Sequence, residues 1–393
     1  MAHPDLSISK GKWRGRESYT LANGCLRLVT LAGGGHIAEL VHIGEDGVSP
    51  LWIPPWTTQE PYSYRARRDA AKYGSITEGK LLSGLTGHNI CLDYFGSPST
   101  EESRQGLSQH GEAPSARWIP ARRRVTASEA ALTLRTRLPV ARLEFEREIT
   151  LCPGEPVVHF RETVTNLARA DHFFHWTQHV TLGPPFLAAD EVTVSLPGTK
   201  VMTFPHGYDE GKALLQPGRT FEWPSAPRKP KGVTDLSRPL SEEGLGYVVG
   251  VLLDPQAEWG FISAVNRRLG LLIAYCFRRA DFPWVALWEE NKAIEAVPWR
   301  AQTVALGLEF GTTPLPVSRR ENFTSGGALF NVPTATCVPA RAAKTVEYMA
   351  CLAHVPPGFG QVRAITPEAS GIVITGAEGA APIRLPVARL GRL

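Results

Sequence analysis

The chain has 393 residues, of which 43% are hydrophobic and 20% charged, and its formal net charge is +4. This balance allows a full hydrophobic core and argues against a disordered chain. The positive excess is small and dispersed, and runs such as Arg122-Arg123-Arg124 are short enough to be solvated, whereas nucleic-acid binders usually carry a strong basic stripe. We therefore expect no nucleic-acid partner.

The cysteines and the apolar runs indicate in which cellular compartment the protein is expected. None of the six cysteines forms a CxxC pair, which argues against a zinc ribbon or a thioredoxin-like site. Several lie in apolar runs, where a buried free thiol is ordinary, so a reducing compartment is expected. No signal-peptide core is visible, and no apolar run approaches the length of a membrane span. The sequence predicts a cytoplasmic protein without a membrane partner.

Scattered proline (32) and glycine (37) divide the chain into short segments, as in an all-β protein. Strands are expected at residues 25–31, 36–43, 131–138, 142–151, 157–166, 173–182, 191–196, 245–253, 259–265, 269–277, 301–310 and 345–354. Short helices are expected at 60–73 and 100–107. So many strands exceed one average sheet, and two large packed antiparallel sheets are implied.

The clearest strand is LEFEREITL, residues 143–151. One face carries Leu143, Phe145, Ile149 and Leu151 and is interrupted by Arg147, whereas the other carries Glu144, Glu146, Glu148 and Thr150 and is expected to face solvent.

The segment 205–240 is rich in Pro, Gly, Lys and Arg and is either a linker or a long surface loop. Apolar strands resume on both sides of it, which favours the loop. We expect one β-sandwich domain over residues 1–393, with an N-terminal extension at 1–20 and a C-terminal extension at 356–393.

Four segments carry residues suited to chemistry. In GLSQHGEAPSARW (106–118), His110 precedes a glycine that permits a sharp turn, and Trp118 follows as an apolar platform; a turn with a surface histidine is the alternative. In FFHWTQHVTLGPPFL (173–187), a strand would place His175, Thr177 and His179 on one face, and Trp176 and Gln178 on the other. Two histidines on one face suit a metal, or an acid beside a structural partner.

In AQTVALGLEFGTTPLP (301–316), Glu309 lies in an apolar run, where burial would raise its pKa towards that of a general base; on an exposed face it would simply be solvated. The fourth segment, LTGHNICLDYF (85–95), contains His88, Asn89 and Asp93 and by itself is typical of a loop and strand. No phosphate-binding loop, GxSxG elbow or HExxH zinc helix is present.

The order of these segments resembles the galactose mutarotase (aldose 1-epimerase) superfamily from about residue 20 to residue 355. GGGHIAEL is similar to an early strand of that family, HGEAPSARW to its HG motif, RETVTNLARADHFFHWTQHVTLG to the strand that ends in a histidine, and ALGLEFGTTPLP to the strand that presents its catalytic glutamate. The resemblance implies an all-β antiparallel supersandwich.

The resemblance also implies a mechanism. Glu309 would remove the proton of the anomeric hydroxyl, His179 would protonate the ring oxygen, and His110 would hydrogen-bond the sugar. A carboxylate and an imidazole flanking one hemiacetal suffice for this chemistry, so no metal or organic cofactor is expected. The partner would be a small-molecule carbohydrate, bound by a monomer or homodimer.

The sequence departs from the family's pattern at three places. His88-Asn89 stands where an Asn-Arg pair is usual, Glu112 follows the HG motif in place of glycine-rich sequence, and the aspartate that grips sugar hydroxyls is not identifiable. The segment FPWVALWEENK is expected to fill that last role. The substrate-binding residues expected are His88, Asn89, Glu112, Trp118, His175, Trp284, Trp288 and Glu290.

Three functions remain open: a mutarotase for a hexose or related sugar, a sugar-binding or sensing module without the reaction, and a metal-dependent isomerase or hydrolase. The last would use His88, His110, Glu112 and His179 as ligands. The joint presence of His179 and Glu309 favours the first over the second, because a binding module needs no acid and base.

Overall fold

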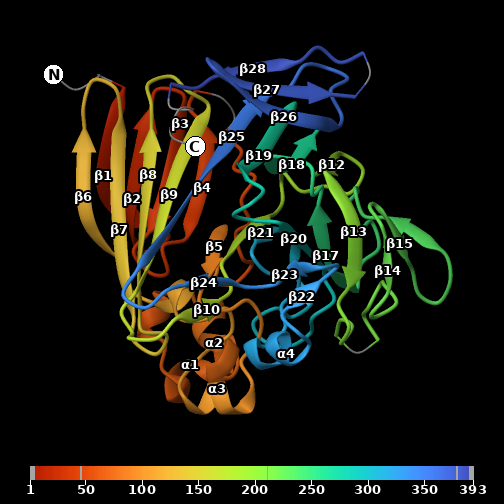
Figure 1. Cartoon of the computed structure of the whole chain (residues 1–393). Helices are drawn as coiled ribbons and strands as arrows, with labels where there is room; N and C mark the ends of the chain where they lie inside the picture. The colour runs from red at the N-terminus through yellow and green to blue at the C-terminus, as the bar shows by residue number, and fades with distance from the viewer. Residues whose placement is uncertain (1–4, 45–46, 210, 378, 389–393) are drawn as a thin grey trace.

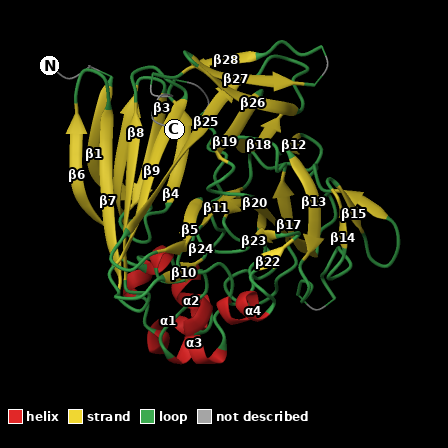
Figure 2. Ribbon diagram, viewed as in Figure 1, coloured by secondary structure: helices red, strands yellow, loops and turns green. Residues whose placement is uncertain are grey.

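The computed structural model describes residues 5–44, 47–209, 211–377 and 379–388. Two large antiparallel sheets dominate it (Figures 1 and 2). The first has eleven strands, in the order β1 (Leu6–Trp13), β2 (Arg16–Asn23), β3 (Leu26–Leu31), β4 (Ile37–His42), β5 (His88–Cys91), β11 (Thr177–Leu182), β21 (Val304–Gly311), β20 (Trp284–Asn291), β17 (Leu245–Leu253), β13 (Gly198–Thr203) and β14 (Thr220–Glu222).

The second sheet has eight strands, in the order β12 (Val192–Ser195), β18 (Trp259–Asn266), β19 (Leu271–Arg278), β25 (Ala343–His354), β9 (Val157–Asn166), β8 (Leu143–Leu151), β7 (Ala130–Leu138) and β6 (Ile119–Val125). The main core lies between the sheets: Phe277 of β19 stacks on Phe310 of β21 at a ring-centroid distance of 4.4 Å. The all-β antiparallel supersandwich expected from the sequence is confirmed.

The remaining elements are short. They are the helices η1 (Pro61–Ser63), α1 (Ala66–Tyr73), α2 (Ile76–Leu82), α3 (Thr100–Arg104), η2 (Ala113–Ser115) and α4 (Arg319–Thr324), and the strands β10 (His172–Phe174), β15 (Ser225–Pro227), β16 (Val233–Asp235), β22 (Ala328–Leu329), β23 (Val332–Pro333), β24 (Thr336–Val338), β26 (Val362–Glu368), β27 (Gly371–Gly376) and β28 (Ile383–Pro386). Helices α1 to α4 gather at one end of the sheets (Figure 1). None of the helices in the described part of the chain is long and apolar enough to cross a membrane.

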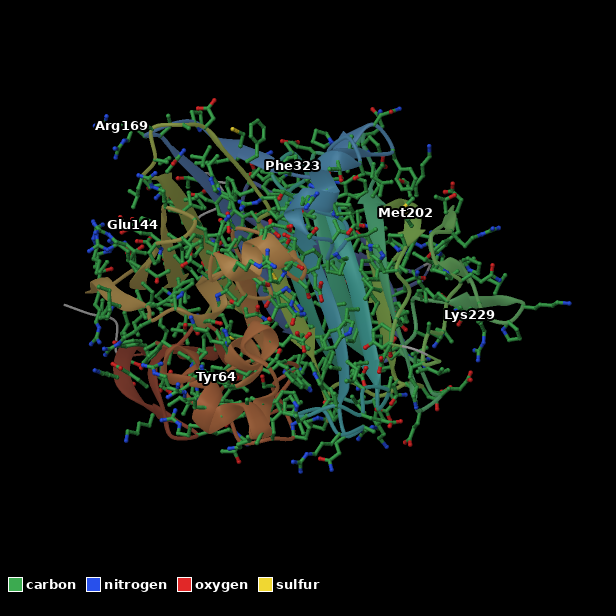
Figure 3. All side chains as sticks on the ribbon, turned by 90° about the horizontal axis from the view of Figure 1, so that it is seen from below. Tyr64, Glu144, Arg169, Met202, Lys229 and Phe323 are labelled. Carbon is green, nitrogen blue, oxygen red and sulfur yellow. The ribbon has the colours of Figure 1, made fainter. Side chains whose placement is uncertain are left out.

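Figure 3 views the molecule from that helical end. Phe323 of α4 lies towards the viewer, whereas Lys229 lies on the β15–β16 hairpin, which projects to one side. This hairpin belongs to the segment 205–240, which also contributes β14 to the edge of the first sheet. At the opposite end, β26, β27 and β28 form a small sheet that packs a second apolar cluster against β18, β19 and β25.

The strand pattern of β8 was predicted correctly on its apolar face and differs on the other. Arg147 is fully buried and donates to Glu162 of β9 at 2.6 Å. The core can hold this charge because the carboxylate of Glu162 neutralises it. Glu144, Glu146 and Glu148 are half-buried, and Thr150, expected to face solvent, is buried beside the turn that follows the strand. The expected strand 173–182 is interrupted at residues 175–176, which separates β10 from β11.

Candidate functional site

Two neighbouring strands at the centre of the first sheet bring His179 and Glu309 together. His179 of β11 lies directly opposite Glu309 of β21, and directly opposite residues of antiparallel strands share a face. Nε2 of His179 is 3.1 Å from Oε1 of Glu309, and the two residues are only 5% and 2% exposed. Alternation along β21 sends Leu308 and Phe310 into the core between the sheets and leaves Glu309 on the other face.

His110 joins this pair from a loop. Its backbone adopts a φ of 60°, and Gly111 follows with a φ of 77° at a point where a side chain would clash with the carbonyl of Leu92. The backbone N–H of His110 donates to Gly96, and its carbonyl accepts from Leu92, so the turn is fixed at both ends. The imidazole lies 5.1 Å from that of His179, measured between ring centroids.

The three side chains line one cavity of about 460 Å³. Its other lining residues are Glu78, Leu81, Leu82, Leu85, Phe95, Gln109, Phe204, His206, Gly207, Tyr208, Asp209, Val248, Trp288, Ile294, Trp299 and Pro316. They come from α2, from the loops near His110, from the segment after β13, and from β17 and β20.

Burial sets the protonation of the central pair. It raises the pKa of Glu309 well above the usual carboxyl range, whereas burial and the neighbouring His110 lower the pKa of His179. Burial also lowers the pKa of His110 to about 4. These opposite directions favour a pair that carries one proton, so that one group can donate while the other accepts. Nδ1 of His179 lies 3.1 Å from the Thr181 hydroxyl, and a proton on Nδ1 leaves Nε2 to accept towards Glu309.

Several polar atoms of the site have no well-aligned hydrogen bond to another described residue: Nδ1 of His110, Oδ1 of Asn89, which lies opposite His179 on β5, and Oε1 of Glu309, whose one polar neighbour is His179. Buried polar groups are usually satisfied, so such a gathering next to a cavity is typical of a site that a ligand completes.

Two further residues expected from the sequence lie at or beside the cavity. Trp288 lines it, with its ring edge-on to His179 at 6.0 Å, and its indole N–H donates to the Tyr208 hydroxyl at 3.0 Å. Glu290 lies behind this contact, where it accepts from the Tyr208 hydroxyl at 2.5 Å and from the backbone N–H groups of Ala293 and Ile294. Glu290 thus holds Tyr208 against the cavity.

The other residues expected to bind substrate do not line the cavity, and each has a partner elsewhere. In the core, His88 contacts Gln178 and Tyr275, and the Trp118 indole donates to Ala113. His175 accepts from the backbone of Phe95 and contacts Asn322. The Trp284 indole donates to Pro333, and Glu112 accepts from the backbone of Ala141. Side chains alternate along β5, so Asn89 lies on the same face of the sheet as His179, and His88 points to the core face instead.

Sequence reasoning did not identify the cavity residues of α2 or of the segment after β13. The apolar triplet Leu81, Leu82 and Leu85 was the available signal, since its spacing suits one face of a short helix. No sequence signal pointed to Tyr208, because the composition of the segment 205–240 indicated only a surface loop.

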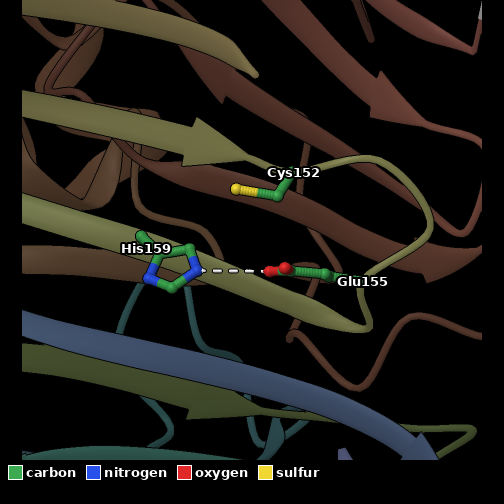
Figure 4. Close-up of side chains that lie close together, drawn as sticks. All are labelled: Cys152, Glu155 and His159. Atoms are coloured by element: carbon green, nitrogen blue, oxygen red, sulfur yellow. Dashed lines mark hydrogen bonds and ion pairs between the residues drawn. The ribbon is translucent and has the colours of Figure 1, made fainter. Parts of the chain in front are cut away.

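The four ligands of the metal-dependent alternative do not form one group, because His88 lies in the core and Glu112 near Ala141. In the described ranges, three potential ligands gather within 4.8 Å only at Cys152 and Glu155, on the turn between β8 and β9, and His159, within β9 (Figure 4). There Glu155 contacts His159 at 3.5 Å and accepts from the backbone N–H of Ala388, so it also anchors the C-terminal segment.

No protein-family model and no curated protein matches the chain, but solved structures do. It is similar to a candidate aldose 1-epimerase from Klebsiella pneumoniae, with a TM-score of 0.62 and 16% identity over 89% of this chain and 84% of that one. The chain has the galactose mutarotase-like fold. A galactose mutarotase-like protein from Clostridium acetobutylicum matches with a TM-score of 0.54 and 11% identity over 89% of this chain and 99% of that one.

A galactose mutarotase related enzyme from Lactobacillus acidophilus matches with a TM-score of 0.51 and 11% identity, covering 86% of this chain and 97% of that one. At these identities the similarity shows the galactose mutarotase-like fold and not the reaction. The resemblance noted in the sequence is therefore confirmed at the level of the fold.

Proposed function

We propose that the chain is an aldose 1-epimerase-like isomerase that interconverts the anomers of a sugar. The observation that carries the proposal is the 3.1 Å contact between Nε2 of His179 and Oε1 of Glu309, within a cavity that both side chains line. A pair that holds one proton between a carboxyl and an imidazole supplies both the acid and the base that ring opening requires.

In the proposed reaction, Glu309 takes the proton of the anomeric hydroxyl as the carboxylate, and protonated His179 gives its proton to the ring oxygen. Transfer of the shared proton from Glu309 to His179 provides these two forms. The bond between C1 and the ring oxygen breaks, C1 becomes an aldehyde, and rotation about C1–C2 presents its other face. Reclosure returns each proton to its starting group. His110 donates or accepts a hydrogen bond near the reacting centre.

The test is the optical rotation of freshly dissolved α-anomers of a panel of sugars. We expect the wild type to exceed the spontaneous rate on at least one sugar, and Glu309→Gln to lose about a hundred- to ten-thousandfold, because an amide cannot accept the proton. Glu289→Gln is the matched control, since Glu289 is equally buried on neighbouring β20 but does not line the cavity.

Two results would overturn the proposal. A wild type that never exceeds the spontaneous rate on any sugar would favour the sugar-binding module instead. Full activity in Glu309→Gln would show that another group is the base.

A further inference from the structure

The floor of the cavity is a section of the first sheet, and its two halves differ in chemistry. The row that contains His179 and Glu309 continues through Ala286 of β20 to Gly250 of β17, but these two residues are covered and do not line the cavity, since Gly250 lies against Pro314. The adjacent row runs from Gly307 through Trp288 to Val248. From Glu309 towards β17, the only polar group in either row is the Trp288 indole.

That indole is already engaged. Its N–H donates to the Tyr208 hydroxyl, which in turn donates to Glu290. Apolar side chains lie next to this half: the backbone of Phe204 bonds to that of Val248, and the ring of Trp299 lies 5.9 Å from that of Trp288. Polar Tyr208 and His206 follow Phe204 on the same segment, and the Tyr208 hydroxyl is occupied by Trp288 and Glu290. A sugar hydroxyl placed directly over Trp288 and Val248 would give up hydrogen bonds to water and find no free polar group on either side chain, which is unfavourable. An apolar group placed here would gain from its own burial.

The charges of the cavity also limit its ligand. None of the described residues that line it is lysine or arginine, whereas Glu78 and Asp209 are exposed lining residues and Glu309 lies inside. Sites that bind phosphate usually supply cationic side chains or several free backbone N–H groups. A phosphorylated sugar would therefore meet acidic groups and no cationic side chain.

We propose that the site takes an unphosphorylated sugar with an apolar substituent remote from C1, such as a deoxy sugar or an O-acylated sugar. The anomeric end lies at His179 and Glu309, and the apolar part lies over Trp288 and Val248. The inference rests on the proposed function, because it uses the catalytic pair to orient the ligand. The flat Trp288 ring suits the C–H face of such a group.

The experiment measures binding by calorimetry with analogues that lack the anomeric hydroxyl and cannot react. The probes are 1,5-anhydro-D-glucitol, its 6-deoxy and 6-O-butanoyl derivatives, and its 6-phosphate. We expect the butanoyl ester to bind about tenfold or more tightly than the parent, since each buried methylene gives about fourfold. The 6-deoxy compound should bind more tightly than the parent, and the phosphate more weakly. Any other order contradicts the inference.

Matched substitutions localise the effect. Val248→Thr keeps the shape and places a hydroxyl on the apolar half, so it should reduce the advantage of the butanoyl ester over the parent by about threefold or more. Val233→Thr makes the same chemical change at a residue that is 68% exposed on β16, outside the cavity, and should leave all affinities unchanged. An unchanged butanoyl advantage in Val248→Thr contradicts the inference.

Binding and turnover separate the two proposals. The expected order of binding without any anomer interconversion overturns the proposed reaction and leaves the ligand class standing. Interconversion of anomers with tighter binding of the phosphate overturns the ligand class and leaves the reaction standing. Absence of binding by every probe contradicts the ligand class, and the reaction is then judged by anomer interconversion alone.

Discussion

Buried polar side chains lie on both faces of strand β11, and the two groups differ in how many of their hydrogen bonds are made. On the core face, Gln178 and Arg147 surround Glu162, whose two carboxylate oxygens accept from Arg147, Gln178, Trp176 and Tyr348. On the other face, His179 and Glu309 lie against a cavity, and in the described ranges Oε1 of Glu309 has no contact with a polar group other than its 3.1 Å approach to His179. Both groups are buried, so burial alone does not distinguish a structural polar cluster from a functional one; incomplete hydrogen bonding next to a cavity is the feature that sets His179 and Glu309 apart from Glu162.

The largest expected effect is on the structural cluster. Arg147→Met should lower the free energy of unfolding by about 3–5 kcal/mol, because it leaves the Glu162 charge buried without its cation. Urea unfolding measures the change. His179→Asn, on the cavity face of β11 in the first sheet, should change the free energy of unfolding by less than about 1 kcal/mol. Equal losses in the two variants would contradict the distinction.

A second prediction concerns the free space next to the carboxylate of Glu309. A side chain at Gly307 would collide with Oε1 of Glu309, so Gly307→Ala should displace the carboxylate and reduce kcat by about tenfold to a hundredfold. Gly260→Ala is a comparable glycine substitution in β18, where the obstacle is Phe277 of the core, and should affect stability rather than kcat. Unchanged kcat in Gly307→Ala would show that the observed carboxylate position is not the active one.

A third prediction concerns Glu289, whose pKa burial raises to about 8. A carboxyl with a raised pKa in the folded state binds its proton more tightly when folded, so the contribution of Glu289 to stability is greatest below about pH 4 and falls as pH rises towards 8. Glu289→Gln should remove this decline, measured by urea unfolding at pH 5 and pH 8. The same decline in wild type and variant would contradict the assignment.

The pair's opposite pKa shifts give a fourth prediction. Activity requires one proton on the pair, and that state extends from the lowered pKa of His179 to the raised pKa of Glu309. The kcat/KM of the wild type should therefore form a broad plateau around neutral pH, falling only outside it. A narrow optimum between the ordinary pKa values of the two groups would show that burial does not separate them in the free enzyme.

The smallest effect is expected at the support of the cavity wall. Tyr208→Phe removes the hydrogen bonds to Glu290 and Trp288 and should raise KM by about fivefold or more, since each net hydrogen bond is worth about 1 kcal/mol and only part of the loss reaches the cavity wall. The value of kcat should change little, because Tyr208 is a positioning residue. A loss of kcat with unchanged KM would assign it a catalytic role.

Much of the fold could be predicted from the sequence, because strand alternation is a local signal. The range 245–253 coincides with β17, and β8 and β9 agree within a residue. Helix α2 was not predicted, since ITEGKLL is short and contains a glycine. His110, His179 and Glu309 share one cavity, but their roles stay predictions. The placements of His88 and Trp118 depend on which face of each strand meets the core, and short motifs do not specify that.

The most direct test of the central claim is a double-mutant cycle on the mutarotation rate, with wild type, Glu309→Gln, His179→Asn and the double variant at saturating sugar. If the two side chains act as one acid–base unit, each single variant loses about a hundredfold or more, and the double variant is scarcely slower than either. Losses that multiply in the double variant would contradict the account, because they would show that His179 and Glu309 act independently.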